Sequence, residues 1–515
     1  MNRAERRRAE QMQKKAAAKR NPDALFAEAL ARHNDGRASD ALTLAEQLLA
    51  AQPEHLDGLQ LAGMAAIQLG DAHKALGFLG DKTRLDPDNP HGHLNHGAAL
   101  QMNGDLEAAA DHFRRAITLD AGLAEAHSNL GVTLRDLSRF AEAEDAMRRA
   151  LSLATATDTR LTVSLASVVQ SLGRIDEAIA LFDQALLLDP SNADFIYKRC
   201  LCRFAKGDFA AAAEDYECRW ASDSFVSEFQ HRPEPSWQGE DLNGKRLLVW
   251  AEQGVGDHII YLGSLPALMA GGGTCVFKCD ERLVSLFNRS LSGIAIVPSG
   301  QTGLEKSHFD FQIAAASLTL QSRIRHPDQY SLGRYLSPDP DRAAGISRRL
   351  QDAAGGRPLI GIAWRSSRQK VGPWKSMPLE KWGPILEGRD ALFVNLQYGE
   401  TETEIATAMR ATGAEIYTDP EIDRFNDFEG LAALIDGLDL VVTTSNVTAH
   451  FAGALAKPCL LALQVTPLWY WGMAAAPTPL YASVERFWQG RENIWTDVAG
   501  DIAARLDELI LSIKS

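Results

Sequence analysis

The stretch PHGHLNHGAALQMNGDLEAAADHFRRAITLD, residues 90–120, decides the fold of the N-terminal half of the chain. Small and bulky apolar residues recur in it at helical spacing on both sides of a turn glycine, Gly104. Two antiparallel helices approach closely only where one of them offers a small residue, and a bulky partner then fills the groove one turn later. The stretch therefore predicts two antiparallel helices joined at Gly104.

The same arrangement recurs every 34 or 35 residues along the N-terminal half, with an alanine five residues after each turn. The turn residues are Gly36, Gly70, Gly104, Ser138, Gly173 and Gly207, and the alanines are Ala41, Ala75, Ala109, Ala143, Ala178 and Ala212. One such unit cannot bury its apolar face alone, so neighbouring units must stack into a solenoid with a concave binding surface. The spacing is typical of the tetratricopeptide repeat and predicts about six repeats over residues 22–226.

Two central repeats carry an asparagine just before the small-residue position of their first helix, Asn95 and Asn129. An asparagine amide that faces a groove can hydrogen-bond an extended peptide backbone of any sequence. The pair resembles part of the asparagine ladder in the solenoid of O-GlcNAc transferases. It predicts a groove for a protein acceptor, and the alternative is two exposed asparagines without a ligand.

Length, net charge and cysteine content argue against several classes of protein. The chain has 515 residues, too many for one hydrophobic core, and a formal net charge of −14, which argues against non-specific nucleic-acid binding. No apolar run is long enough to span a membrane, and the basic leader, residues 1–21, lacks the apolar core of a secretory signal. The six cysteines form no CxxC pair and are typical of reduced thiols. We therefore expect a cytoplasmic protein without stable membrane insertion, whose leader is either solvated or docks on an acidic surface.

After a proline-containing linker, residues 227–245, the pattern changes to short apolar runs that alternate with helical segments. Such alternation predicts parallel sheets covered by helices on both faces. The runs form two series, residues 246–340 and 356–515, which predict two Rossmann-like lobes facing a cleft. In such sheets, ligands bind beyond the carboxyl ends of the strands.

The first loop at such an end, EQGVGDHI (252–259), places titratable side chains behind two glycines, Gly254 and Gly256. Glycines let the backbone approach a substrate closely. A base that deprotonates an acceptor hydroxyl is expected here, and Glu252, Asp257 and His258 all remain candidates. The alternative for Asp257 is that it only caps the helix that follows.

Three further loops supply candidate donor-binding residues. In the loop 365–378, Arg365 and Ser366 directly follow a strand. Lys375 precedes a predicted helix that opens at Pro378. The lysine ammonium group and the free N–H groups at the start of that helix would together bind a phosphate group. In 444–454, a strand-to-helix turn contains the capping residues Ser445, Asn446 and Thr448, followed by His450. The remaining loop, 397–402, begins with Gln397. For Arg365, Ser366 and Lys375, the alternative is a solvated side chain, and for His450 it is a structural histidine.

These loops resemble those of a known family. GVGDHIIYLGSLPAL (254–268), GPWKSMPLEKW (372–382) and LVVTTSNVTAHFAGALAKP (440–458) resemble the GD-x-x-x-TLPAL, lysine–tryptophan and DTG-x-x-H elements of lipopolysaccharide heptosyltransferases. Together with the repeats, they resemble bacterial glycosyltransferases linked to tetratricopeptide repeats, which include flagellin-modifying enzymes that attach nonulosonic acids. The resemblance implies a GT-B fold and an inverting, metal-independent reaction.

The resemblance also implies residue roles. It makes Asp257 the base, assigns the donor phosphate to Lys375 and the Ser445–Thr448 turn, and places Gln397 in the same pocket. One departure is that Ser445 stands where heptosyltransferases have aspartate, and Val447 where they have glycine. Heptose is therefore disfavoured as the donor sugar, while phosphate binding by the backbone is retained.

The expected function is transfer of a sugar from a nucleotide donor to Ser or Thr hydroxyls of a protein acceptor, with flagellin as the acceptor that the resemblance suggests. No cofactor or metal is expected, because the D-x-D triplets at Asp86–Asp88 and Asp339–Asp341 do not follow strands of the lobes. A non-catalytic adaptor with a degenerate transferase domain is the alternative, which Ser445 favours and Lys375 disfavours. A dinucleotide-binding enzyme is disfavoured because no third glycine follows Gly256.

Overall fold

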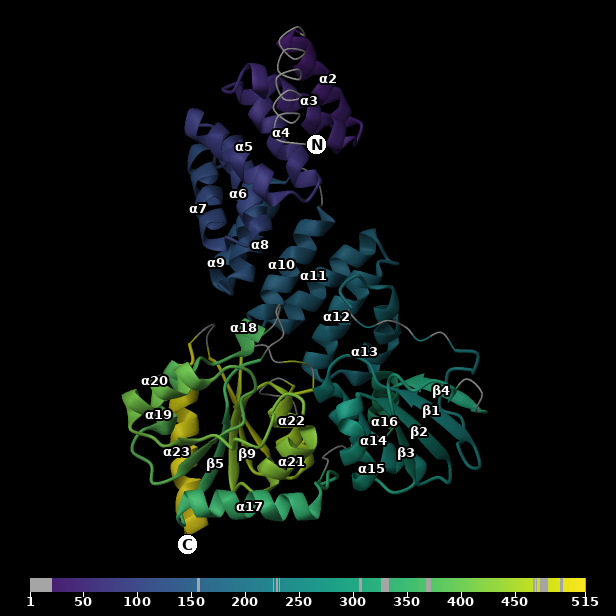
Figure 1. Ribbon diagram of the computed structural model, residues 1–515. Helices are drawn as coiled ribbons and strands as arrows, with labels where there is room; N and C mark the ends of the chain where they lie inside the picture. The colour runs from purple at the N-terminus through teal and green to yellow at the C-terminus, as the bar shows by residue number, and fades with distance from the viewer. Residues whose placement is uncertain are drawn as a thin grey trace, which may run out of the picture. The chain divides into compact units, whose positions relative to one another are not determined.

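The computed structural model describes most of the chain (Figure 1). The described residues are 21–154, 158–225, 227, 230, 232–304, 308–325, 333–366, 372–465, 468, 470–472, 480–490 and 494–514. The predicted basic leader lies outside them except for Asn21, whose side chain caps the first described helix by accepting a hydrogen bond from the Asp23 N–H. The chain forms two compact units, one ending at Val169 and the other beginning at Gln170, and each is described by itself.

The first unit consists of helices that, except for the last, pack on their neighbours in sequence, and the first helices of the first four repeats also contact one another in succession. They are α2 (Pro22–Asn34), α3 (Ala38–Ala51), α4 (Leu56–Gln68), α5 (Ala72–Leu85), α6 (Pro90–Asn103), α7 (Leu106–Leu119), α8 (Ala124–Asp136), α9 (Phe140–Leu153) and α10 (Thr159–Ser171), which runs across the boundary. Three more helices of the same kind open the second unit: α11 (Ile175–Leu188), α12 (Ala193–Lys206) and α13 (Phe209–Tyr216), followed by the 3₁₀ helix η1 (Glu217–Ala221).

The repeat pattern is confirmed at its turns. All six predicted turn residues have a positive φ, between 58° at Ser138 and 89° at Gly104. Ser138 therefore adopts the same left-handed conformation as the glycines of the other repeats, although a side chain makes this conformation less favourable.

The small and bulky positions also meet as predicted. A β-carbon added to Gly97 would lie 2.7 Å from the Phe113 ring, and one added to Gly131 would lie 2.8 Å from the Met147 side chain. All six repeat alanines are fully buried. The two helices of a repeat thus approach each other at the positions where the sequence provides no side-chain bulk.

The second unit continues with a parallel sheet in the strand order β3-β2-β1-β4. Its strands are β1 (Arg246–Trp250), β2 (Thr274–Cys279), β3 (Ile294–Pro298) and β4 (Phe311–Ala314). In β1, Leu247 pairs with Cys275 on one side and Phe311 on the other. The connections contain α14 (Val255–Met269), η2 (Glu281–Leu283) and α15 (Val284–Ser290), and α16 (Ala315–Arg325) follows β4. The core of this first lobe lies where Ile259–Leu262 of α14 pack, fully buried, with the sheet.

A second parallel sheet has the strand order β10-β9-β8-β5-β6-β7. The strands are β5 (Leu359–Ala363), β6 (Leu392–Asn395), β7 (Ile416–Tyr417), β8 (Leu440–Thr444), β9 (Cys459–Leu463) and β10 (Val484–Trp488). The helical elements are α17 (Pro340–Ala354), α18 (Gly372–Lys375), η5 (Leu379–Trp382), α19 (Gly383–Leu386), α20 (Glu402–Thr412), α21 (Phe428–Asp436), α22 (Val447–Ala454) and α23 (Thr496–Lys514). Residues 359–363 and 440–444, in the two central strands, are buried without exception.

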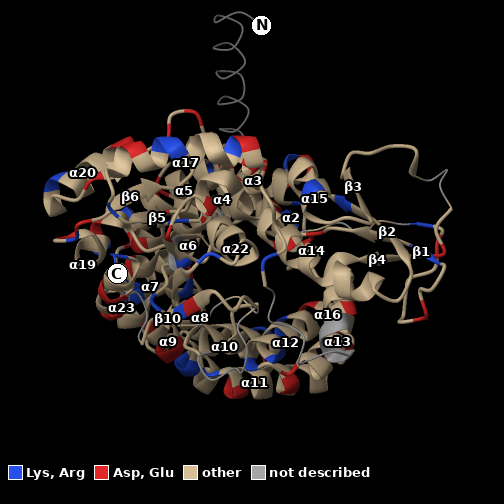
Figure 2. Ribbon diagram, turned by 90° about the horizontal axis from the view of Figure 1, so that it is seen from below, with Lys and Arg blue, Asp and Glu red and all other residues tan. Residues whose placement is uncertain are grey.

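Helix α17 occupies the stretch between the two predicted series of strands. Ile346 and Leu350 are buried, and the helix packs against α21 of the second lobe. The helix contains both acidic and basic residues (Figure 2). This stretch is therefore a packed helix of the second lobe.

In both sheets the strand order reverses at the first strand, between β1 and β4 and between β5 and β8. This reversal is the position where open parallel sheets bind ligands, beyond the carboxyl ends of the strands. The predicted helical solenoid followed by two α/β lobes is confirmed. Among the described residues, no helix combines the length and apolar character needed to cross a membrane.

Candidate functional site

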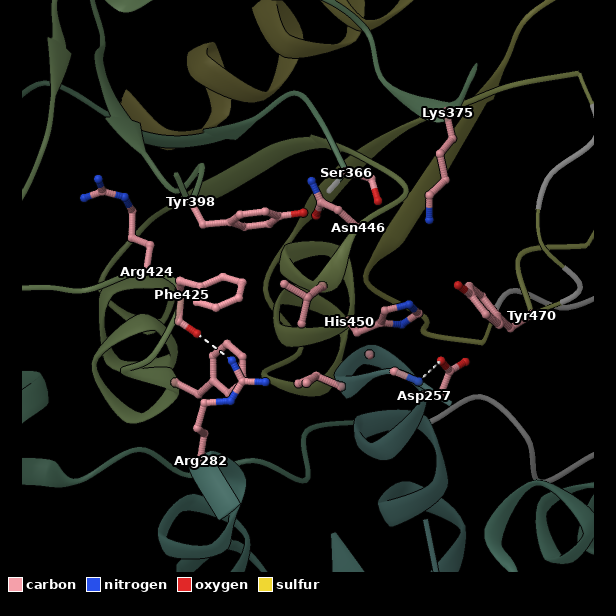
Figure 3. A pocket seen from close by; sticks show the side chains of 15 residues that line it. Asp257, Arg282, Ser366, Lys375, Tyr398, Arg424, Phe425, Asn446, His450 and Tyr470 are labelled. Atoms are coloured by element: carbon pink, nitrogen blue, oxygen red, sulfur yellow. Dashed lines mark hydrogen bonds between the residues drawn. The ribbon is translucent and has the colours of Figure 1, made fainter. Parts of the chain in front are cut away.

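A cavity between the two lobes lies at the carboxyl ends of their strands (Figure 3). The cavity has a volume of about 180 Å³ and is open to solvent on one side. The first lobe contributes Gly254, Val255, Gly256, Asp257 and Arg282, and the second contributes Ser366, Lys375, Tyr398, Arg424, Phe425, Phe428, Asn446, Val447, His450 and Tyr470.

Asp257 lines the cavity and also caps the helix that carries it. Helix α14 begins directly after the turn that follows β1, with Gly254 as its N-cap residue. The Asp257 carboxylate accepts a hydrogen bond from the backbone N–H of Gly254 at 3.0 Å (Figure 3). The capping role predicted as an alternative is present, and the same carboxylate belongs to the cavity wall.

The other two candidate bases lie away from the cavity wall. The Glu252 carboxylate is buried and accepts two hydrogen bonds from Arg219, at 2.9 and 3.2 Å. The His258 ring is also buried, and its Nδ1 accepts a hydrogen bond from the backbone N–H of Asp280 at 3.2 Å. Burial lowers the pKa of His258 to about 4. Of the three, Asp257 is the one whose carboxylate borders the cavity.

Lys375 lies at the C-terminal end of the short helix α18 and lines the cavity, although only 4% of it is exposed. The helix predicted to open at Pro378 is the 3₁₀ helix η5, which begins at Leu379. Lys375 is close enough to His450 for its charge to lower the pKa of that histidine. It therefore contributes a largely buried positive charge to the second-lobe wall.

The turn between β8 and α22 contributes one predicted polar side chain to the cavity. Asn446 caps α22 by accepting a hydrogen bond from the Thr448 N–H at 2.9 Å, and it lines the cavity. Ser445 instead accepts a hydrogen bond from the Trp471 indole N–H at 2.9 Å. The Thr448 hydroxyl is buried and has no hydrogen-bond partner among the described residues. Neither Ser445 nor Thr448 belongs to the cavity wall.

Gln397 is fully buried behind the cavity wall. Its side-chain oxygen accepts hydrogen bonds from the backbone N–H groups of Trp364, at 3.0 Å, and Arg365, at 2.8 Å. It thereby ties the residues that follow β6 to those that follow β5. The next residue, Tyr398, is the one that lines the cavity.

Of the two residues predicted after β5, only Ser366 lines the cavity. Its backbone N–H donates a hydrogen bond to the Ser376 hydroxyl at 3.0 Å, which brings the loop close to α18. Arg365 forms an ion pair with Glu404 and also donates to the Glu400 carbonyl. The Arg365 side chain thus belongs to the contact between this loop and the start of α20.

His450 is surrounded by aromatic side chains. Its ring stacks on Trp471 with a centroid distance of 4.8 Å and meets Tyr470 edge-on at 5.0 Å. The Nδ1 atom lies 3.4 Å from the Tyr481 hydroxyl. Burial, together with the charge of Lys375, lowers the pKa of His450 to about 3. A neutral imidazole therefore lines the cavity at physiological pH.

Two arginines in the cavity wall were not predicted. Arg282 follows β2, pairs with Asp280 at 2.8 Å and donates a hydrogen bond to the Phe425 carbonyl at 2.9 Å. Arg424 donates a hydrogen bond to the Gln397 carbonyl at 2.9 Å. A signal for Arg282 is present in the sequence, because the charged run Asp280–Arg282 directly follows a strand-like apolar run. The cavity thus combines one carboxylate with three cationic side chains, counting Lys375.

The predicted acceptor residues lie in the first unit. Asn95 and Asn129 occupy equivalent positions in α6 and α8, which contact each other, and both are partly exposed. In the part of the chain that the structure describes, no group of three or more His, Cys, Asp or Glu side chains is arranged to hold a metal ion.

Comparison with known proteins identifies the repeats. The tetratricopeptide repeat family matches residues 61–124, 94–158 and 164–222. The chain contains tetratricopeptide repeats. Such arrays present an extended concave surface for binding, and the repeats support a role in protein interaction.

The chain is also similar to Protein FlbA of Caulobacter vibrioides, with 27% identity over 402 residues that cover 68% of this chain and 67% of FlbA. Among solved structures, it is similar to the MamA protein, with 23% identity over 33% of this chain and 93% of MamA and a TM-score of 0.30. It is likewise similar to a thermophilic tetratricopeptide repeat protein of Thermus thermophilus, with 23% identity, coverage of 35% of this chain and 98% of that protein, and a TM-score of 0.30.

Proposed function

We propose that this protein is an inverting glycosyltransferase that moves a sugar from a nucleotide donor to a Ser or Thr hydroxyl of a protein acceptor bound by the repeats. One observation carries the proposal. Asp257 borders the same inter-lobe cavity as Lys375, Arg282 and Arg424, at the carboxyl ends of two parallel sheets. The cavity therefore offers both a proton acceptor and positive charge for a phosphate.

The cationic side chains suit the leaving group. A nucleotide that departs from the sugar gains negative charge on its phosphate, and fixed positive groups in a partly buried site stabilise that charge strongly. Lys375 is largely buried, and the Arg282 guanidinium is held in place by Asp280 and the Phe425 carbonyl. Because these groups are supplied by the chain, the proposed reaction requires no divalent cation.

In the proposed reaction, Asp257 removes the proton of the acceptor hydroxyl. The hydroxyl oxygen forms a new bond to the anomeric carbon as the bond from that carbon to the donor phosphate oxygen breaks. Attack from the side opposite the phosphate inverts the configuration of the sugar. Gly254 lines the cavity beside Asp257 without a side chain, whereas the space that a side chain at Gly256 would need is filled by the His450 ring.

Aromatic side chains suit the nucleoside part of the donor. Tyr398 and Phe425 lie in the second-lobe wall with their ring centroids 5.9 Å apart. Flat aromatic surfaces of this kind bind nucleobases by stacking, whatever the base. We therefore assign the nucleoside to this end of the cavity and the sugar to the end where Asp257 lies.

The protein acceptor is assigned to the repeats, with Asn95 and Asn129 as candidate contacts. Flagellin as the acceptor, and a nonulosonic acid as the sugar, rest on the resemblance of the loop motifs. A non-catalytic adaptor remains the second candidate, because the Ser445 hydroxyl is engaged by Trp471 and does not border the cavity.

The test uses the purified full-length chain, flagellin as the acceptor and a panel of nucleotide sugars that includes a nucleotide-linked nonulosonic acid. Intact mass spectrometry of the acceptor should show a gain of one sugar mass per modified hydroxyl with one member of the panel. The Asp257→Asn variant serves as the matched inactive enzyme. If no donor binds to the chain and no acceptor gains mass, while the acceptor still binds, the adaptor function is correct.

A further inference from the structure

The last tetratricopeptide repeat contacts the loop that leads into α14, the helix that carries Asp257. This loop, residues 251–254, connects β1 to α14. Side chains from α13 and η1, at the end of the repeats, reach it at two consecutive residues, Glu252 and Gln253. These elements belong to the same compact unit as both lobes.

The first of these contacts is a buried ion pair. Arg219 of η1 is fully buried, and its guanidinium donates to the two oxygens of Glu252 at 2.9 and 3.2 Å and to the Ser317 hydroxyl at 2.8 Å. The guanidinium also lies 4.0 Å from the centre of the Tyr216 ring and 4.1 Å from that of Trp220. Removing one member of a buried pair leaves an uncompensated charge, so this contact resists rearrangement.

The second contact fixes an unusual backbone conformation. Gln253 has a φ of 68°, which is uncommon for a residue with a side chain and persists only where the surroundings hold it. Its backbone N–H donates to the Ser227 hydroxyl at 2.9 Å, and its side-chain amide donates to the Tyr216 hydroxyl at 3.2 Å. The next N–H, that of Gly254, donates to Asp257. The hydrogen bonds thus connect Tyr216 to Asp257 through two adjacent residues.

We infer that Arg219 and Tyr216 are positioning residues for Asp257, so that the last repeat is a structural part of the candidate active site. This inference rests on the proposed function for the role of Asp257. It also gives Glu252 a definite role, because the Glu252 carboxylate anchors the loop to the repeat. Dividing the chain between the repeats and the lobes should therefore abolish activity.

The chain offers a matched control for ordinary stabilisation. Arg199 of α12 forms ion pairs with Asp215 at 2.8 Å and Asp183 at 2.7 Å, so it ties together helices of the last repeats. All three of these residues lie within the repeats. The Arg199→Met variant removes ion pairs within the last repeats and leaves the contacts of Arg219 and Tyr216 with the loop in place, while Arg203 still pairs with Asp215.

The experiment compares full-length wild type with Arg219→Met, Arg219→Lys, Tyr216→Phe and Arg199→Met. Hydrogen exchange of a peptide spanning residues 251–258 should be at least tenfold faster in Arg219→Met and a few-fold faster in Tyr216→Phe, as expected for lost hydrogen bonds. Arg219→Lys, which keeps the charge but not the bidentate contact, should restore part of the protection, and Arg199→Met should leave it at the wild-type level. In transfer assays, kcat should fall with the loss of protection while KM for the donor stays within about twofold, because the cations of the cavity are unchanged.

Each outcome decides one question. Unchanged exchange of residues 251–258 in Arg219→Met, or equal acceleration in Arg199→Met, overturns the positioning role even if the wild type transfers sugar. Accelerated exchange with a wild type that transfers no sugar refutes the proposed function and leaves the anchoring of the loop intact. If Arg219→Met does not fold, Tyr216→Phe decides alone, since it retains the ring and removes only the hydroxyl.

Discussion

The ring of His450 lies directly against the backbone of Gly256. A β-carbon at residue 256 would lie 2.7 Å from Cδ2 and 3.3 Å from Nε2 of that ring. Gly256 belongs to α14 of the first lobe and His450 to α22 of the second. The backbone of the first lobe therefore contacts a side chain of the second lobe directly. The contact lies in the wall of the cavity, next to Asp257.

The Gly256→Ala variant tests this contact. The added methyl group must displace a histidine that Trp471 and Tyr470 hold in place, and overpacking of this kind typically costs about 1–3 kcal/mol. We expect a lower melting temperature and weaker donor binding, measured by calorimetry. Gly345→Ala in α17 is the control, because a β-carbon there meets no atom within 4 Å and alanine favours the helix. If Gly256→Ala has the melting temperature and donor affinity of the wild type, the contact between Gly256 and His450 contributes to neither.

The Asp257→Asn variant tests the base. Asparagine can still accept the hydrogen bond from the Gly254 N–H, so the melting temperature should stay near that of the wild type. Transfer should fall by about 10²–10⁴-fold, the usual contribution of a general base. The measurement is the initial rate of acceptor modification. His258→Gln is the control, and its transfer rate should fall less, since His258 lies behind the cavity wall. A wild-type transfer rate in Asp257→Asn would show that Asp257 is not the base.

The Lys375→Met variant tests the phosphate site. Loss of a charge-assisted contact of about 1.5–3 kcal/mol should weaken donor binding by roughly 10- to 100-fold. Because the charge of Lys375 lowers the pKa of His450, that pKa should also rise in the variant. Isothermal titration with the nucleotide sugar measures the first effect, and Lys381→Met, which changes an exposed lysine nearby, is the control. Equal donor affinities in the two variants would argue against a phosphate at Lys375.

Chelation tests the proposed independence from metal ions. Lys375, Arg282 and Arg424 are assigned the charge of the leaving phosphate, so transfer should persist in excess EDTA. The check is the initial rate before and after dialysis against the chelator. A rate that collapses on chelation and returns with Mg²⁺ or Mn²⁺ would contradict this assignment.

The sequence predicted the repeats well because each repeat position carries a strict steric requirement. Gly97 faces Phe113 at a distance that leaves no room for a β-carbon, and the turn at Ser138 keeps its left-handed φ although serine replaces glycine. Alternation of apolar runs and helical segments likewise predicted two α/β lobes. The strand orders could not be predicted, since each depends on contacts between segments far apart in the chain.

The site was predicted in part. Asp257, Lys375 and Asn446 were chosen because they stand at the carboxyl ends of strands, and all three border the cavity. Spacing alone does not determine whether a side chain at a strand end turns toward the ligand or back into the protein. Gln397 turns back to bind the backbone that follows β5, and Glu252 turns toward Arg219, a residue of the repeats.

A histidine cluster in the first unit predicts a pH-dependent stability. His112 of α7 lies with its Nδ1 3.1 Å from Nδ1 of His93, and its ring centroid is 4.2 Å from that of His96. Burial, reinforced by the two neighbouring imidazoles and opposed by Asp111, lowers the pKa of His112 to about 4. Burial also lowers the pKa of His96. The folded unit therefore favours the neutral form of this cluster.

The sign of the effect follows from proton binding. In the unfolded chain, a histidine has a pKa of about 6.5, so between pH 6.5 and 4 the unfolded state binds more protons than the folded state. The stability contributed by neutral His112 is complete above pH 6.5 and is lost as the pH falls toward 4. Allowing for the partial exposure of the ring, we expect the unit to lose about 1 kcal/mol between pH 7 and pH 5. Hydrogen exchange of peptides from α6 and α7 in the full-length chain, corrected for the intrinsic pH dependence, measures this loss. His112→Leu should reduce the dependence of stability on pH, whereas His91→Leu, at an exposed position on α6, should not. The same change of stability with pH in wild type and His112→Leu would show that His112 is not responsible.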